Sequence, residues 1–123
     1  MASRVVHFEI PIDDPDRASS FYGSVFGWNV AKWGPADYWT MTTGEEPGIG
    51  AEGALVPRAE APDGVLVYVG VGDIDQVLAE VRRAGGSVAT DKMPIPTMGW
   101  SARFRDTEGN LVGLFQEDSG AGG

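Results

Sequence analysis

With 123 residues, of which 42% are hydrophobic, the chain is long enough for one compact domain and too short for two ordinary ones. Its formal net charge of −9 leaves no basic surface for phosphates, so we expect no nucleic-acid partner. The chain contains no cysteine, which excludes disulfides, thiolate metal sites and cysteine nucleophiles.

The first half of the chain predicts a strand, a helix and three further strands. In residues 5–12 apolar and polar side chains alternate, which is typical of a strand with one face against an apolar layer. Asp14 followed by Pro15 predicts the start of a helix, and Gly27 predicts its end after residue 26. The further strands are expected at residues 28–33, 37–43 and 49–56.

After a linker expected at residues 57–63, the same order begins again. Residues 64–71 predict a strand, and Asp73 predicts the start of a helix that ends before Gly85. Three more strands are expected at residues 87–90, 100–106 and 110–116, followed by a flexible tail at residues 118–123. The longest apolar stretch, residues 64–72, is far shorter than the roughly 20 residues that cross a bilayer. The first residues also lack a signal peptide, so we expect a cytoplasmic protein with no membrane partner.

The two halves are related by an internal repeat. A shift of 59 residues places Asp14 on Asp73 and Gly27 on Gly86, the residues at the ends of the two helices. The repeat predicts a single domain of two tandem βαβββ modules, residues 5–56 and 64–117. Such modules form an α+β fold in which a curled mixed sheet surrounds a cup, and the functional site is expected in the cup.

Two sequence motifs resemble those of the vicinal oxygen chelate superfamily. They are HFEIPIDDPDRASSFYGSVFGW, which starts at His7, and FRDTEGNLVGLF, which starts at Phe104. The superfamily includes glyoxalase I, extradiol dioxygenases, fosfomycin-resistance enzymes, methylmalonyl-CoA epimerase and metal-free bleomycin-binding proteins. The resemblance covers essentially residues 5–117 and implies the glyoxalase/bleomycin resistance fold.

The resemblance also implies where metal ligands would lie. Metal-using members take one ligand from the first strand and one from the last strand of each module. His7 matches the first position, but the repeat places Leu66 at its counterpart, and Gly113 stands where the closing strand usually has glutamate. Glu52 is the remaining candidate ligand. Because one imidazole and one carboxylate cannot hold a divalent ion, we expect no metal and no other cofactor.

An alternative is a metal-dependent lyase, similar to lactoylglutathione lyase, or an epimerase, isomerase or dioxygenase. It would use His7 and Glu9 as catalytic residues, because imidazole titrates near neutral pH and a carboxylate on the same strand face can orient it. Under this alternative the metal is held by His7 and Glu52. Arg103 and Arg105 are the available groups for stabilising an oxyanion, although we expect them on the solvated outer face of their strand.

The alternation of side chains predicts a mainly apolar cup. Its expected ligand-binding residues are Leu66, Tyr68, Met98, Trp100, Leu111, Gly113 and Phe115. The loop at residues 92–99 predicts a lid, and Gly113 is expected to open volume where a metal ligand would otherwise lie.

This composition favours a protein that binds a small organic molecule in the cup. An apolar face of this size also promotes association, so we expect a homodimer. Two matters stay open: whether the modules close within one chain or across a dimer, and whether these side chains merely fill the cup or an interface.

Overall fold

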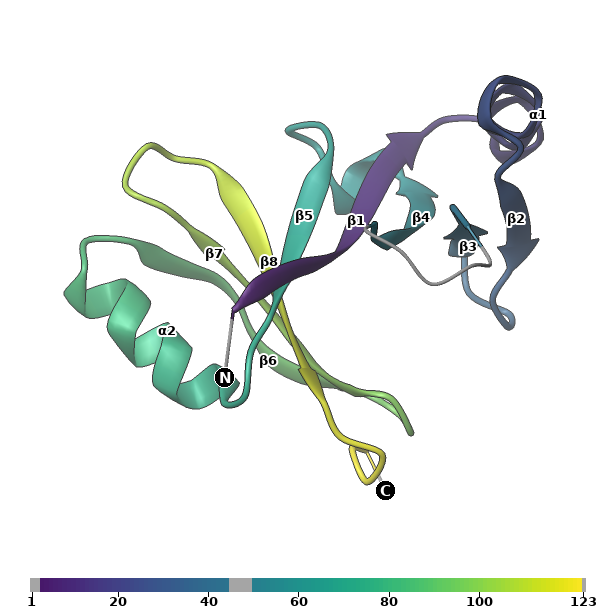
Figure 1. Ribbon diagram of the computed structural model, residues 1–123. Coiled ribbons are helices and arrows are strands. Elements are labelled where there is room, and N and C mark those ends of the chain that lie inside the picture. The colour runs from purple at the N-terminus through teal and green to yellow at the C-terminus, as the bar shows by residue number, and fades with distance from the viewer. Residues whose placement is uncertain (1–2, 45–49, 123) are drawn as a thin grey trace. The chain divides into compact units, whose positions relative to one another are not determined.

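The structure, a computed structural model, describes residues 3–44 and 50–122. The chain divides into two units, Val6–Leu66 and Val67–Gly123, the second of which also includes Met1–Val5. Both halves have the order strand, helix and three strands (Figure 1). The predicted fold class, α+β with two βαβββ modules, is confirmed.

The first module is built on one parallel strand pair. Its elements are β1 (Arg4–Ile12), α1 (Pro15–Phe26), β2 (Asn29–Lys32), β3 (Trp39–Thr42) and β4 (Glu52–Pro57). The strands lie in the order β2-β3-β4-β1, with β1 and β4 parallel and the other pairs antiparallel. β4 starts at Glu52, later than the expected strand at residues 49–56. Ile49 lies outside the described residues. A short 3-10 helix, η1 (Arg58–Glu60), begins the expected linker.

Helix α1 has the bounds that its capping residues predict. The Asp14 side chain accepts a hydrogen bond from the Arg17 N–H at 3.1 Å, and Gly27 closes the helix with a left-handed φ of 73°. Directly after this glycine, Trp28 stacks on Tyr22, with the two ring centroids 5.5 Å apart. The cap thus turns the chain so that Trp28 packs back on its own helix.

The second module repeats the arrangement. Its elements are β5 (Leu66–Gly70), α2 (Ile74–Arg83), β6 (Ser87–Ile95), β7 (Gly99–Arg105) and β8 (Leu111–Glu117). The strands lie in the order β5-β8-β7-β6, and β5 pairs parallel to β8. Asp73 caps α2 by accepting from the Gln76 N–H, and Gly109 in the β7–β8 turn has the expected positive φ, 84°.

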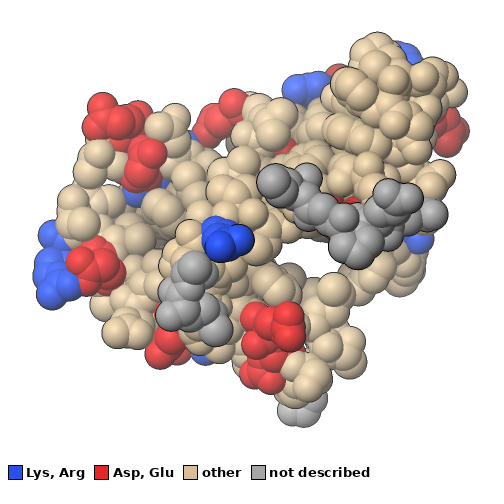
Figure 2. Space-filling view, in the orientation of Figure 1, with Lys and Arg blue, Asp and Glu red and all other residues tan. Residues whose placement is uncertain are grey.

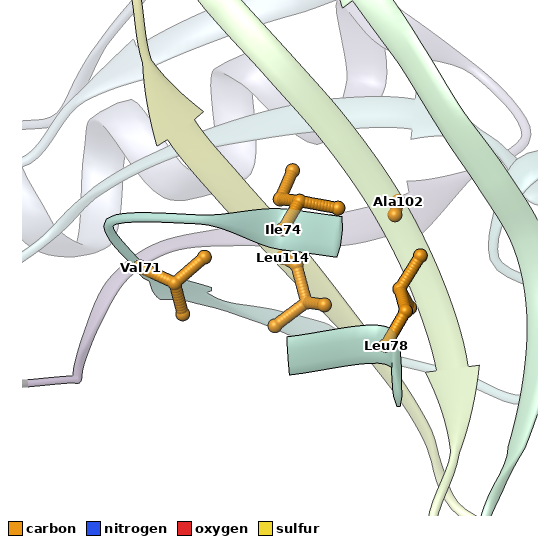
Figure 3. Close-up of a cluster of buried hydrophobic side chains, with 5 residues drawn as sticks. All are labelled: Val71, Ile74, Leu78, Ala102 and Leu114. Carbon is orange, nitrogen blue, oxygen red and sulfur yellow. The ribbon is translucent and has the colours of Figure 1, made fainter. Parts of the chain in front are cut away.

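Helix α2 and one face of this sheet enclose an apolar core (Figure 3). Its buried members are Val71, Ile74, Leu78, Ala102 and Leu114. Trp100 and Phe104 pack against them, and the Gln116 side chain accepts a hydrogen bond from the Ile74 N–H at 2.9 Å. Every second residue of β7 and β8 therefore faces the helix, and the intervening residues form the opposite face.

Two segments near the end of the chain are joined by backbone hydrogen bonds. Residues 92–95 belong to β6 and Ile95 pairs with Gly99, so the predicted lid is a tight β-hairpin with Thr97 at a φ of 67°. Residues 118–122 form a turn, in which the Thr97 N–H donates to the Ala121 carbonyl at 3.1 Å and the Asp118 N–H donates to the Met98 carbonyl at 3.0 Å. Ala121 is buried, so its side chain also packs this polar segment against the rest of the module.

Asp118 is expected to make the stability of this turn depend on pH. The Trp100 indole N–H, 3.0 Å from its carboxylate, is the largest cause that lowers the Asp118 pKa below its ordinary value of 3.8. Such a carboxyl contributes stability above its unfolded pKa, and the contribution is lost as the pH falls through the folded pKa. Thermal unfolding between about pH 6 and 2 should therefore depend less on pH in Asp118→Asn and in Trp100→Phe. Identical pH profiles in all three proteins would contradict this role.

Two further properties follow from the described residues. In the view of Figure 2, acidic side chains form several separate groups and not one patch. Within residues 3–44 and 50–122, neither helix has the length and apolar character needed to span a membrane.

Candidate functional site

In the first module, β1 carries a cluster of three polar side chains. The His7 Nε2 atom lies 2.8 Å from the Tyr38 hydroxyl and 3.8 Å from a Glu9 carboxylate oxygen. Glu9 is buried, at 5% exposure, and the His7 ring is partly exposed. His7 and Glu9 are thus brought together as strand alternation predicts.

Tyr38 is a member of this cluster that the sequence did not reveal. It lies just before β3, and its carbonyl accepts a hydrogen bond from the Trp33 N–H at 2.9 Å, which closes the β2–β3 turn. The turn therefore decides where the phenol lies. The tautomer of His7 decides whether the phenol donates to Nε2 or accepts from it. A proton can pass from the phenol to the imidazole only when Nε2 is the acceptor.

The position of Glu52 depends on the register of β4, which the sequence leaves open. Glu52 pairs with His7 across the parallel β1–β4 ladder. Its carboxylate accepts a hydrogen bond from the Thr43 backbone N–H at 3.0 Å. The Glu52 carboxylate is therefore hydrogen-bonded to the backbone just after β3, although the Glu52 backbone pairs with that of His7.

In the second module, the face opposite α2 carries a bonded arginine and tyrosine. Arg103 and Tyr68 both pair with Gly113, one from β7 and the other from β5. The Arg103 Nε and Nη2 atoms donate to the Tyr68 hydroxyl oxygen at 3.2 and 3.0 Å, and the guanidinium carbon lies 5.9 Å from the ring centroid. The expectation that Arg103 lies on an outer solvated face is wrong, because the adjacent residues Ala102 and Phe104 take the helix side of β7 and Arg103 bonds Tyr68 on the opposite face.

Gly113 is required by the ring of Tyr68. A Cβ atom at position 113 would lie 2.7 Å from Cγ of Tyr68 and closer still to Cδ2 and Cε2. The glycine therefore does not open an empty volume, as the sequence suggested, because the aromatic ring already fills it. The first module shows the same type of packing, since a Cβ at Gly53 would meet the ring of Phe8.

The remaining predicted ligand-binding residues divide into two sets. Leu66, Leu111 and Phe115 lie on the same strand faces as Tyr68 and Gly113, at spacings of two residues. Trp100 lies on the other face of β7, where it packs against the core and its ring lies 4.7 Å from the Lys92 ammonium. Met98 lies in the β6–β7 turn and is exposed. The structure thus does not bring Trp100 and Met98 to the Tyr68 face.

Comparisons with known proteins establish the family. Residues 4–44 match the family described as bleomycin resistance protein-like N-terminal. A glyoxylase-like domain-containing protein of Didymella fabae is 32% identical in an alignment 108 residues long, which covers 83% of this chain and 84% of the relative. The chain belongs to the vicinal oxygen chelate superfamily. It is a glyoxalase-like and bleomycin-resistance-like member.

Solved structures show the same fold along almost all of this glyoxalase-like chain. Methylmalonyl-CoA epimerase from Mycobacterium tuberculosis gives a TM-score of 0.72 at 17% identity, with 94% of this chain and 88% of that chain covered. A glyoxalase/bleomycin resistance protein/dioxygenase superfamily member from Vibrio splendidus 12B01 gives 0.66 at 21%, with 94% and 100% covered. A methylmalonyl-CoA epimerase in complex with methylmalonyl-CoA and NH4+ gives 0.67 at 18%, with 98% and 99% covered. At these identities the likeness is one of fold.

Among residues 3–44 and 50–122, the structure shows no donor set that fits the metal of metal-using superfamily members. Leu66 offers no lone pair, and the space beside Gly113 is filled by the Tyr68 ring. Glu52 is engaged with the Thr43 N–H. Within the described residues, no three histidine or carboxylate side chains converge, whereas a divalent transition metal needs at least three protein donors.

Proposed function

We propose that the protein binds a small organic molecule, without a metal, on the face of the second module that carries Tyr68. The proposed binding residues are Leu66, Tyr68, Leu111, Gly113 and Phe115, with Arg103 added by the structure. The observation that carries the proposal is the Arg103–Tyr68 hydrogen-bonded pair on a face that also carries the apolar side chains of Leu111 and Phe115. Ligand sites in proteins typically combine apolar walls with a few fixed polar groups.

The exposure of the individual residues supports this choice. Gly113 and Tyr68 are buried, whereas Arg103, Leu111 and Phe115 are partly exposed. A molecule that covers the three partly exposed residues would bury apolar surface and also meet a fixed guanidinium. The epimerase complex with methylmalonyl-CoA shows in addition that a protein of this fold holds a small organic molecule.

A thermal-shift series tests the proposal. The protein is heated with and without EDTA, in the presence of small aromatic, carbonyl-containing and quaternary ammonium compounds. A compound at about 100 times its dissociation constant should stabilise the native state by roughly 2.7 kcal/mol, which raises the melting temperature by several degrees. We expect at least one class to do so equally with and without EDTA. If no compound raises the melting temperature, the proposal fails.

The second candidate is an enzyme that uses His7 and Glu9, and the observation that favours it is the short contact from His7 to Tyr38. A phenol, an imidazole and a buried carboxylate that lie next to one another in space are groups suited to proton transfer. Protein purified without chelator is analysed for zinc, nickel, iron and manganese. A stoichiometric metal that is lost in His7→Ala would favour the enzyme and overturn the metal-independent proposal. Metal far below one equivalent would support binding without metal.

We also propose that the protein is a homodimer. Phe21, Val25 and Phe26 of α1 are each more than half exposed, and large apolar side chains in such a group favour association. Sedimentation equilibrium of the wild-type protein should give twice the 13.0 kDa of one chain. A mass of one chain at micromolar concentration would contradict the dimer.

A further inference from the structure

We propose that Phe115, Ser101 and Met93 determine which ligand the Tyr68 face takes: a small, neutral aromatic compound that carries a carbonyl group. The inference rests on the proposed function, because it specifies what the same face binds. The aromatic ring of the ligand lies against Phe115 and Met93, and its carbonyl oxygen accepts a hydrogen bond from the Ser101 hydroxyl.

The three residues form one row across the sheet of the second module. Phe115 of β8 pairs with Ser101 of β7, and Ser101 pairs with Met93 of β6. Directly paired residues of antiparallel strands carry their side chains on the same face, and Phe115 shares its face with Gly113. The row therefore belongs to the Tyr68 face, and it adds Ser101 and Met93, which the sequence did not reveal.

The apolar members of the row are open to solvent. The Phe115 ring leans over β7, since a Cβ atom at Gly99 would lie 3.0 Å from its Cε1 atom, and the residue is partly exposed. The Lys92 ammonium lies over the ring of Trp100 on the helix side, so the next residue, Met93, points to the opposite face. Met93 is 50% exposed. A flexible thioether of this kind adapts to an aromatic guest and makes favourable sulfur–ring contacts.

Ser101 is the polar member of the row. In the part of the chain that the structure describes, its hydroxyl has no hydrogen-bond partner, and the residue is partly exposed. An apolar ligand that covered Ser101 would remove water from the hydroxyl and leave it unpaired, which is unfavourable. A ligand oxygen at this place accepts the hydrogen bond instead. Ser101 therefore favours a ligand with an oxygen over a hydrocarbon of the same shape.

Charges of opposite sign lie on the two sides of the row. Arg103 is two residues from Ser101 on β7, and Glu117 is two residues from Phe115 on β8, so both share the face of the row. Arg103 already donates two hydrogen bonds to Tyr68. A cation in the row is repelled by Arg103 and an anion by Glu117, so a neutral molecule is preferred to either.

Methyl NMR tests the contact with the row directly. The chain has four methionines, of which Met41 is buried in the first module and Met98 lies in the β6–β7 turn. In protein labelled with carbon-13 at the methionine methyl groups, acetophenone should shift the Met93 signal, because an adjacent aromatic ring changes the local magnetic field. The signals of Met41 and Met98 should not move. Met93→Leu removes one signal and so assigns it. A larger shift at Met98 than at Met93 would place the ligand at the turn and overturn the inference.

Four probes of similar size test the class of ligand: acetophenone, ethylbenzene, benzoate and phenyltrimethylammonium. Acetophenone should bind to the wild-type protein about threefold or more tighter than each of the others. Ser101→Ala should weaken acetophenone by about two- to tenfold, the range of one neutral hydrogen bond, and should not weaken ethylbenzene. Met93→Ala should weaken both of these probes by a similar factor, roughly two- to tenfold, because only apolar and sulfur–ring contacts are lost.

Met98→Ala and Ser24→Ala are the matched controls. They make the same chemical changes at an exposed residue of the β6–β7 turn and at an exposed residue of α1 in the first module. Both should leave the affinity for acetophenone unchanged. Circular dichroism and the melting temperature report the fold of each variant.

The outcomes distinguish the inference from the proposed function. If another probe binds as tightly as acetophenone, or if Ser101→Ala leaves the ratio of the acetophenone and ethylbenzene affinities unchanged, the inference is wrong while binding on the Tyr68 face stands. If acetophenone does not bind but another compound of the thermal-shift series raises the melting temperature, the inference is again wrong. If no compound of that series does so, the proposed function itself is wrong.

Discussion

A methyl group added at Gly113 is expected to destabilise the protein by about 1–3 kcal/mol, the usual cost of overpacking a filled site. The new Cβ would meet the ring of Tyr68, which cannot move freely because Arg103 holds its hydroxyl. Alanine would otherwise be favoured over glycine in a strand, by roughly 0.5–1 kcal/mol. A loss of stability therefore reports the contact. Urea unfolding of Gly113→Ala measures it.

A double-mutant cycle identifies the ring as the cause. In a Tyr68→Ala background, the cost of Gly113→Ala should largely disappear, because the two residues are in direct contact and their effects are not additive. Gly23→Ala is the control, since a Cβ at Gly23 would make only an ordinary contact, 3.5 Å from the Trp28 carbonyl oxygen. It should stabilise α1 by about 0.5–1 kcal/mol. Additive costs at Gly113 and Tyr68 would show that the ring does not determine the glycine.

Gly113→Glu extends the same experiment to binding. It introduces the carboxylate that the superfamily usually has here, but the ring of Tyr68 must first leave its place. We expect a larger loss of stability than for alanine and loss of ligand binding at a temperature where the variant is folded. Unchanged binding in a folded Gly113→Glu variant would place the ligand site elsewhere.

Leu114→Ala is expected to have the largest effect on stability, a loss of about 2–5 kcal/mol. Leu114 is 1% exposed in the core between α2 and its sheet. Truncation removes apolar contacts and leaves a cavity, and the loss is a large part of the 5–15 kcal/mol that ordinary domains possess. Urea unfolding measures it, and Ile74→Val, in the same core, should cost only about 0.5–1.5 kcal/mol.

The comparison of two adjacent residues separates folding from binding. Leu114 faces the helix and Gly113 faces Tyr68, because successive side chains of a strand point to opposite faces. Leu114→Ala should therefore keep its affinity for any ligand of the Tyr68 face when measured well below its melting temperature. A folded Leu114→Ala variant that has lost this affinity would show that the two faces are coupled.

The elements were predictable where local chemistry decides them. Asp14 and Gly27 satisfy the backbone at the two ends of α1, so the predicted bounds agree with the observed helix. The repeat of these end residues in α2 then predicted the second module. The pairing register of the strands could not be predicted from the sequence, because residues that pair across strands are far apart in the chain. Nothing in residues 49–56 shows that Glu52 pairs with His7.

The candidate site was predicted in part. Alternation placed His7 with Glu9, and Tyr68 with Gly113 and Phe115, because a period of two is a property of any strand. It also placed Arg103 opposite Trp100, but it did not show which of the two faces the helix. That choice depends on α2, whose apolar side takes Trp100 and thereby turns Arg103 toward Tyr68.

The sequence by itself determined the superfamily, the two modules and the ends of the helices, since each depends on residues close together in the chain or on a repeated pattern. Tertiary structure alone decided that Tyr38 reaches His7, that the Tyr68 ring fills the space beside Gly113, and that Arg103 bonds its hydroxyl. These contacts join residues about 30 to 45 positions apart, and their geometry is set by strand pairing and packing, which local preferences do not specify.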